Sequence, residues 1–176
     1  IMTIPSNIAK ILVVVDPSAD KQVALERAII TSQYRDKSEV QFHVFIGVDP
    51  ESANMKANND NLHRDHAWFD STIRKPLEAA GLRFEVSFSW SDEWQQSIVL
   101  EAKQFGAETI YLPVQAKTNK RRFTFSENKW DLLKTAGCPV ALVRPDAQAD
   151  RKIVLAAVNF QAKRDEQRAL NERILN

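Results

Sequence analysis

The sequence predicts an α/β fold, in which a five-stranded parallel sheet is covered by helices on both faces. Apolar, β-branched runs of strand length alternate along the chain with segments of helical periodicity, as in a parallel sheet connected through helices. The first apolar run is continuous instead of alternating, which is typical of a strand buried on both sides. With 176 residues, of which 44% are hydrophobic, the chain can build the core of one domain, or of one domain plus a fragment.

The first half of the chain contains two predicted strands and two predicted helices. We expect strands over residues 8–15 and 40–47, separated by a helix from residue 23 to about residue 35. The polar, turn-rich segment 50–61 is expected to form a loop or lid. The helix after it carries one apolar face, made of Trp68, Phe69, Ile73 and Leu77, and Gly81 is its expected left-handed C-cap.

The second half of the chain completes the predicted sheet. A strand over residues 83–90 is followed by a helix over residues 92–105, which Gly106 ends, and by a strand over residues 108–114. A basic loop then precedes a helix over residues 126–135 and a last strand over residues 138–144. The resulting order is five strands alternating with four helices, within about 145 residues.

After this domain the sequence starts a second time. The Lys10-Ile11 and Ala24-Leu25 pairs recur as Lys152-Ile153 and Ala169-Leu170, again in a strand followed by a turn and a helix. We therefore expect a first domain over residues 1–145, a linker over 146–150, and the shortened start of a second, similar domain over 151–176. The alternative is that two strand–helix units merely look alike.

Three segments resemble the universal stress protein family. They are KILVVVDPSADKQVALERAI from Lys10, PLEAAGLRFEVSFSW from Pro76, and FTFSENKWDLLKTAGCPVALVRP from Phe123, which contains Cys138-Pro139-Val140. With the restart at Arg151, the chain is most similar to the tandem-domain, E-type branch. The resemblance implies a sheet in the order 3-2-1-4-5, of the kind found in adenine-nucleotide α-hydrolases, with ligands at the carboxyl ends of strands 1 and 4. It also implies that Asp16 lies at that crevice, where nucleotide-binding members place an aspartate against adenosine.

This chain lacks the glycine motif of the nucleotide-binding members of the family. The pattern Gly-x2-Gly-x9-Gly-Ser/Thr falls on Pro113, Ala116, Ser126 and Glu127. Proline has no N–H group to donate to a phosphate, and Glu127 would place a carboxylate beside it. The sequence therefore predicts that the usual ATP cradle is absent, and no cofactor is predicted.

A basic loop nevertheless follows the fourth strand, and its cations could replace backbone N–H groups in holding an anion. We expect an anionic small molecule, such as a phosphorylated metabolite, to bind between this loop and the end of the first strand. The candidate binding residues are Asp16, Pro17, Lys117, Lys120, Arg121, Arg122 and Ser126, the last as a helix N-cap. The alternative is a solvated charged loop without a ligand.

The histidines, the cysteine, and the Asp16 and Ser18 side chains give little indication of a metal or catalytic site. His63 and His66 share a helix face, but a third ligand at fixed spacing is missing, so no metal site is predicted. His43 lies within an apolar strand and is expected to bond to a backbone group. Cys138 is expected to be buried, and Asp16 or Ser18 could cap the following helix. No catalytic residue is predicted.

Composition narrows the choice of partners and compartment. A net charge of +1 gives no reason to expect a nucleic acid or an anionic membrane surface as partner, and the apolar runs are too short to span a membrane. The single cysteine suits the cytoplasm. We expect a non-catalytic stress-response module that self-associates through the edge strand near Val140–Val143. The alternative is a nucleotide-binding protein or nucleotide-dependent enzyme of the adenine-nucleotide-binding α/β group.

Overall fold

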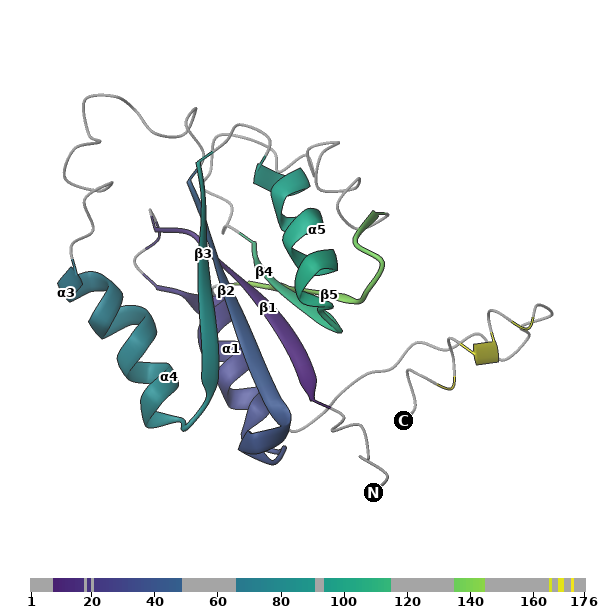
Figure 1. The fold of residues 1–176 in the computed structure, drawn as a ribbon, viewed down its shortest axis with the longest axis horizontal. Helices are drawn as coiled ribbons and strands as arrows, with labels where there is room; N and C mark the ends of the chain where they lie inside the picture. Colours follow the sequence, from purple (N-terminus) through teal and green to yellow (C-terminus); the bar gives the residue numbers. More distant parts are fainter. Residues whose placement is uncertain are drawn as a thin grey trace, which may run out of the picture.

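A computed structural model of the chain confirms the predicted parallel sheet and its strand order. The five strands lie in the order β3-β2-β1-β4-β5, and every neighbouring pair is parallel (Figure 1). The structure describes residues 8–17, 19, 21–48, 66–90, 94–114 and 135–144, together with residues 165, 168, 169 and 172, which are helical.

The strands begin and end within two residues of the predicted positions. Their bounds are β1 (Ala9–Val15), β2 (Val40–Val48), β3 (Arg83–Trp90), β4 (Thr109–Pro113) and β5 (Val140–Val143). Because all five run in the same direction, their carboxyl ends lie at one edge of the sheet and their amino ends at the other. The two outer strands are β3 and β5, so the expected position of β5 at the sheet edge is confirmed.

The helices follow the predicted order. The described helical segments are α1 (Val23–Ser32), a short 3₁₀ turn (Lys37–Glu39), α3 (His66–Phe69), a π-helical turn (Asp70–Arg74), α4 (Lys75–Ala79) and α5 (Trp94–Phe105). The predicted loop 50–61, the helix 126–135 apart from Thr135, the linker 146–150 and almost all of the second segment 151–176 lie outside the described residues.

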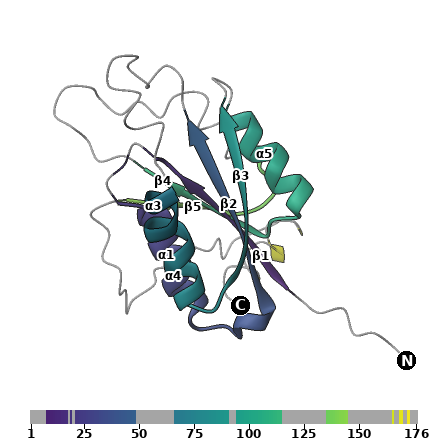
Figure 2. The same cartoon turned by 60° about the vertical axis from the view of Figure 1, so that its left-hand side comes forward.

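The sheet separates two apolar cores, because successive side chains of a strand point to opposite faces. Val13 and Val15 of β1 pack on one face with Phe42 and with Ile73 and Leu77 from the helix after β2. On the other face, a second cluster brings together Leu12, Val14, Phe45, Ile98 and Ile110. Figure 2 shows α1 and α3–α4 together on one side of the sheet, with α5 on the opposite side.

The helix between β2 and β3 is not regular, which the sequence analysis did not predict. Its middle turn is π-helical, and the N–H group of Lys75 donates to the carbonyl oxygen of Asp70, five residues earlier. Pro76 explains this widening, because proline has no N–H group and its ring clashes with the carbonyl four residues before it. The helix therefore accommodates Pro76 while Ile73 and Leu77 both stay buried.

Gly81 ends this helix as predicted. Its φ angle is 68°, a left-handed conformation that glycine adopts without strain. The N–H group of Gly81 donates to the carbonyl oxygen of Glu78, and that of Leu82 donates to the carbonyl oxygen of Leu77. These two bonds form a Schellman motif, which turns the chain directly into β3.

Candidate functional site

The candidate site lies where β1 and β4 separate at the carboxyl edge of the sheet. The pairing of β1 with β4 runs only from Ile11–Thr109 to Val13–Tyr111, whereas β1 stays paired with β2 as far as Val15. Beyond Tyr111, β4 continues beside β5, and the N–H group of Val114 donates to the carbonyl oxygen of Val143 at 2.8 Å. The two halves of the sheet thus diverge at this edge, at the switch point where ligands of such sheets bind.

Asp16 and Pro17 lie at this divergence, directly after the fully buried end of β1. Both residues are half-buried, and the carbonyl oxygen of Asp16 accepts a hydrogen bond from the N–H group of Ala19 at 3.1 Å. Pro113, which stands at the first position of the lost glycine motif, is the last residue of β4. The basic residues Lys117, Lys120, Arg121 and Arg122, and Ser126, lie outside the described part of the chain.

Gln22 holds the loop between β1 and α1, a role that the sequence analysis missed. Its side-chain oxygen accepts from the N–H group of Asp16 at 3.2 Å, and its Nε2 donates to the carbonyl oxygens of Asp16 at 2.7 Å and Ala19 at 3.2 Å. Gln22 itself is buried. Three hydrogen bonds from one buried side chain fix the backbone of Asp16 relative to the helix start.

The suggestion that Asp16 caps α1 is wrong. The N-cap position belongs to Gln22, whose side chain makes no capping bond to the first turn. Asp16 is six residues earlier, too far to reach the free N–H groups of the helix. Ser18, the other suggested cap, is not among the described residues. The loop is therefore shaped by Gln22 bonding backward to the strand end, and the carboxylate of Asp16 is not needed for helix capping.

A second polar cluster lies on the α5 face of β2 and β3. His43 is 7% exposed, and its Nε2 lies 2.8 Å from the Ser87 hydroxyl oxygen and 3.5 Å from a carboxylate oxygen of Glu101 on α5. The prediction that His43 bonds to a backbone group is wrong, because its close partner is this side-chain hydroxyl. The imidazole also packs against the ring of Phe105, with 5.1 Å between the ring centroids.

This cluster contains a serine, a histidine and an acid, but their geometry is not that of a catalytic triad. His43 Nδ1 is 4.0 Å from the nearest carboxylate oxygen of Glu85, which exceeds hydrogen-bond distance, and among the described residues that nitrogen has no hydrogen-bond partner. Glu85 is instead engaged by Gln41, whose Nε2 donates to it at 3.2 Å. We interpret the cluster as a polar link that connects α5 to β2 and β3.

The single cysteine, Cys138, also bears on function. Cys138 is partly buried beside the core on the α5 face, and burial raises the pKa of its thiol, which lowers its reactivity.

Among the described residues, no group of three or more His, Cys, Asp or Glu side chains could hold a metal ion. Within the same part of the chain, no helix is both long and apolar enough to cross a membrane.

The sequence matches a known domain family over most of its length. The model of the universal stress protein family matches residues 7–144. Among curated proteins, universal stress protein E of Photorhabdus laumondii is 27% identical over 179 residues, which cover 97% of this chain and 56% of that protein. The chain thus spans about half the length of the curated relatives that it matches.

Solved structures share the fold. A functionally unknown protein from Pseudomonas aeruginosa PAO1 is similar with a TM-score of 0.63 and 21% identity, over 97% of this chain and 55% of that one. The universal stress protein from Archaeoglobus fulgidus in complex with dAMP is similar with a TM-score of 0.51 and 16% identity, over 78% of this chain and 98% of that one. At these identities the likeness extends to the arrangement of the sheet and helices.

Proposed function

The chain belongs to the universal stress protein family, and from this premise we propose that it is a non-catalytic stress-response module that binds an anionic small molecule. The proposed site is the divergence of β1 and β4, with Asp16 and Pro17 on one side. The anion would be held from the other side by the cations Lys117, Lys120, Arg121 and Arg122, with Ser126 as the predicted N-cap of the next helix. The observation that carries the proposal is the half-buried end of β1 at the switch point, together with a cluster of cations in the segment that follows β4 in the sequence.

The chemistry of the residues favours side-chain binding over an ATP cradle. Backbone cradles need glycines that approach the phosphates closely and donate N–H groups, and this chain has Pro113, Ala116 and Ser126 at those positions. Arginine side chains bind phosphates and carboxylates through two parallel hydrogen bonds, so they can replace a backbone cradle. A phosphorylated metabolite would therefore be bound mainly by charged side chains and less by backbone N–H groups.

The nucleotide-binding alternative also has support. The similar Archaeoglobus fulgidus protein was solved in complex with dAMP. Asp16 is half-buried at the end of β1, where a carboxylate could accept hydrogen bonds from ribose hydroxyls. The two proposals differ in the role of Asp16, because ribose hydroxyls would donate to its carboxylate, whereas binding of inorganic phosphate would depend on the cations that follow β4.

Titration calorimetry separates these possibilities. The purified chain is titrated with inorganic phosphate, ribose 5-phosphate, AMP and ATP, and the same series is repeated with Arg121→Glu and Asp16→Asn. Lys103→Glu is the matched charge control, because Lys103 is an exposed cation in the last turn of α5, six residues before the start of β4 and thus near the amino edge of the sheet. We expect Arg121→Glu to weaken binding of a phosphate ligand at least about tenfold, while Lys103→Glu leaves it unchanged.

The role of Asp16 then identifies the ligand class. If Asp16→Asn weakens AMP and ribose 5-phosphate but not inorganic phosphate, the carboxylate binds ribose hydroxyls, and tighter binding of AMP than of ribose 5-phosphate then supports the nucleotide-binding alternative. If none of the four ligands produces heat, or if Arg121→Glu changes none of the affinities, the proposed anion site is wrong. Mass spectrometry of small molecules released from the purified protein provides an independent test.

We also propose self-association through β5 and residence in the cytoplasm. The edge strand β5 exposes Leu142, at 39% of its surface, while Val143 beside it is buried. Among the described residues this strand is paired only with β4, so its other side could offer backbone N–H and carbonyl groups to a second copy. The single cysteine is compatible with a reducing compartment.

A further inference from the structure

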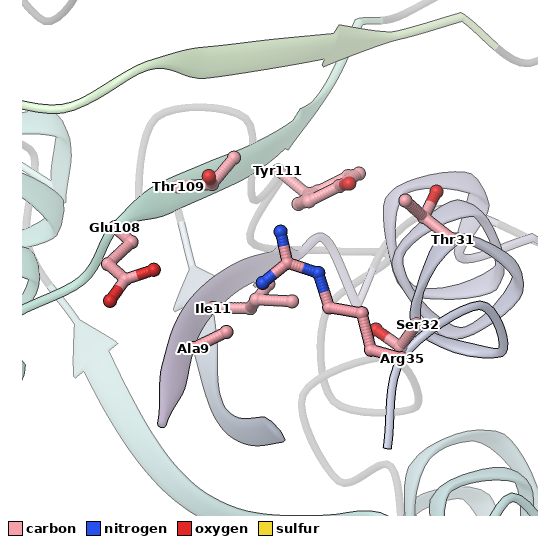
Figure 3. A pocket seen from close by; sticks show the side chains of 8 residues that line it. All are labelled: Ala9, Ile11, Thr31, Ser32, Arg35, Glu108, Thr109 and Tyr111. Atoms are coloured by element: carbon pink, nitrogen blue, oxygen red, sulfur yellow. The ribbon is translucent and has the colours of Figure 1, made fainter. Parts of the chain in front are cut away.

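A cavity opens at the amino edge of the sheet, at the end opposite the divergence of β1 and β4. Its volume is about 60 Å³, and it lies between the end of α1 and the starts of β1 and β4 (Figure 3). Ligand sites for whole nucleotides are several times larger, at about 300–1,000 Å³. The cavity holds about four to six water-sized groups, which limits a ligand to a small molecule or to one small substituent.

The floor of this cavity is apolar and fixed. Ala9 and Ile11 of β1 and Tyr111 of β4 line it, and all three are buried. The pairing of Ile11 with Thr109 holds the two strands together directly beneath the cavity. Since this floor belongs to the central strands of the sheet, it does not need to move when a ligand binds.

The rim carries one cation and one anion. Arg35 extends from beyond the end of α1 over Ile11 toward β4, and Glu108 stands on the far side, just before β4 (Figure 3). The backbone of Glu108 is anchored, because its N–H group donates to the carbonyl oxygen of Lys10 at 2.8 Å. Within the described part of the chain, the side chains of Arg35 and Glu108 form no ion pair with each other or with a third residue.

The hydroxyl groups on the helix side are already engaged. The Thr31 hydroxyl donates to the carbonyl oxygen of Arg27 at 2.9 Å, and the Ser32 hydroxyl donates to that of Ala28 at 2.7 Å. The hydroxyls of Thr109 and Tyr111 make no such bond to the described residues, so both can donate to a ligand. The polar groups left for recognition are thus a guanidinium, a carboxylate and two hydroxyls.

We propose that this cavity binds a small zwitterion, in which a carboxylate and an ammonium group are separated by one or two carbon atoms. The guanidinium of Arg35 would receive the carboxylate through two hydrogen bonds, with the Thr109 or Tyr111 hydroxyl as a further donor. The carboxylate of Glu108 would accept the ammonium group. A molecule with only one of these charges would leave either Arg35 or Glu108 without its partner.

Glycine is the simplest probe of this site. The ¹⁵N-labelled full chain is titrated with glycine, acetate and methylammonium, and the amide signals of Thr109 and Tyr111 are followed by NMR. For a ligand of five non-hydrogen atoms we expect a Kd in the millimolar range, with acetate and methylammonium at least about tenfold weaker. The signals of Asp16 and Val114, at the opposite edge of the sheet, should not shift, which keeps this test independent of the proposed anion site.

Variants with matched controls define the two contacts. Arg35→Ala and Glu108→Gln should each weaken glycine at least about tenfold, and Arg35→Lys should retain part of the affinity. Both positions are exposed, so these variants should fold, which circular dichroism checks. Lys103→Ala and Glu26→Gln remove exposed charges outside the cavity and should leave glycine binding unchanged.

Three results would overturn the proposal. The first is the absence of any shift at Thr109 and Tyr111 up to about 100 mM glycine, a concentration well above the expected Kd. The second is acetate binding as tightly as glycine, which would make the cavity a plain anion site. The third is glycine binding that survives Glu108→Gln unchanged, because the ammonium contact would then not exist.

Discussion

The Nε2 atom of His43 lies 2.8 Å from the hydroxyl oxygen of Ser87, so that a hydrogen bond joins β2 to the edge strand β3 on the face covered by α5. The pair is diagonal in the sheet, because His43 stands opposite Glu85 and Ser87 stands opposite Phe45. His43 is buried at this point, and its Nδ1 atom has no hydrogen-bond partner in the part of the chain that the structure describes. Ser87 is therefore the close polar contact of a buried imidazole.

Removing the Ser87 hydroxyl should destabilise the protein. Ser87→Ala leaves the buried imidazole without its closest partner, and we expect the free energy of unfolding to fall by about 1 kcal/mol. Urea unfolding followed by fluorescence measures the change. Ser89→Ala is the control, because Ser89 lies on the same face of β3 two residues further along. Equal effects of the two substitutions would show that the His43 contact adds nothing.

Gln22 should be important for the loop that carries Asp16. Gln22→Ala removes the three hydrogen bonds that a buried side chain makes to the backbone of Asp16 and Ala19, so we expect a loss of about 2 kcal/mol in the free energy of unfolding. Gln22→Glu should also destabilise, because a carboxylate cannot donate to the carbonyl oxygens of Asp16 and Ala19. Gln33→Ala, at an exposed position after α1, serves as the control. Faster amide hydrogen exchange at Asp16 in Gln22→Ala, but not in Gln33→Ala, would localise the effect.

The pKa of Asp70 should depend on Arg74. A side-chain hydrogen bond from Arg74 lowers the pKa of this carboxyl group, with Nε and Nη2 each 2.7 Å from a carboxylate oxygen. A lowered pKa in the folded state means that the carboxylate favours folding above the pKa of the unfolded chain. This contribution disappears as the pH falls through the lowered value.

An NMR titration of the Asp70 carboxyl carbon tests this dependence. Arg74→Gln should raise the pKa of Asp70 toward its ordinary value, and added salt should act in the same direction because the pair is exposed. Arg83→Gln, which removes a cation at the start of β3, should leave the pKa of Asp70 unchanged. An identical titration curve in Arg74→Gln would contradict the assignment of the shift to this pair.

Cys138 should react slowly with thiol reagents. Burial raises the pKa of its thiol, so less of the reactive thiolate is present at neutral pH. Since the raised pKa belongs to the folded state, the associated stability is present at low pH and is lost as the pH rises through that pKa. Alkylation by iodoacetamide should reach half its maximum rate at a higher pH than for an exposed cysteine.

An exposed cysteine for comparison is provided by Tyr34→Cys combined with Cys138→Ser, because Tyr34 is 84% exposed. Each of the two proteins then carries one cysteine, so each pH–rate profile reports a single thiol. If the midpoints of their pH–rate profiles coincide, burial does not control the Cys138 thiol.

Self-association should depend on Leu142 if it proceeds through the β5 edge. Leu142→Lys places a charge at the proposed interface and should raise the Kd of a dimer about tenfold or more. Leu100→Lys is the matched control, because Leu100 is 58% exposed but lies on α5. Light scattering over a range of protein concentrations measures the mass. A strictly monomeric profile of the unmodified chain, or equal effects of both substitutions, would exclude this interface.

Local sequence patterns predicted the strands and the glycine C-cap well, for physical reasons. The run from Ile11 to Val15 is apolar at every position because β1 is buried on both faces, and such a run is visible without tertiary information. Gly81 was predictable because a left-handed turn favours glycine whatever surrounds it. The irregular turn before Pro76 could have been inferred from that proline, since its missing N–H group breaks the regular helical ladder.

The contacts of polar side chains could not be predicted in the same way. Gln22 bonds back to Asp16, and His43 bonds across to Ser87, 44 positions later in the sequence. Both contacts depend on where the fold places a long or planar side chain. The hydrophobic periodicity of the local sequence does not predict such a position. Asp16 was placed correctly at the end of β1 because its position follows from the strand alone. The basic residues from Lys117 to Arg122 stay a prediction, because they lie outside the described residues.

The short join between β1 and β4 has a mechanical consequence. In the described part of the chain, the ladder between β1 and β4 contains three residue pairs, whereas β2 and β3 share eight. We expect local unfolding to begin at this short pairing between β1 and β4. The strands β4 and β5 should then unfold together as one cooperative unit before the rest of the sheet. Backbone amides of β4 and β5 should accordingly lose their hydrogen-exchange protection at lower denaturant concentrations than those of β2.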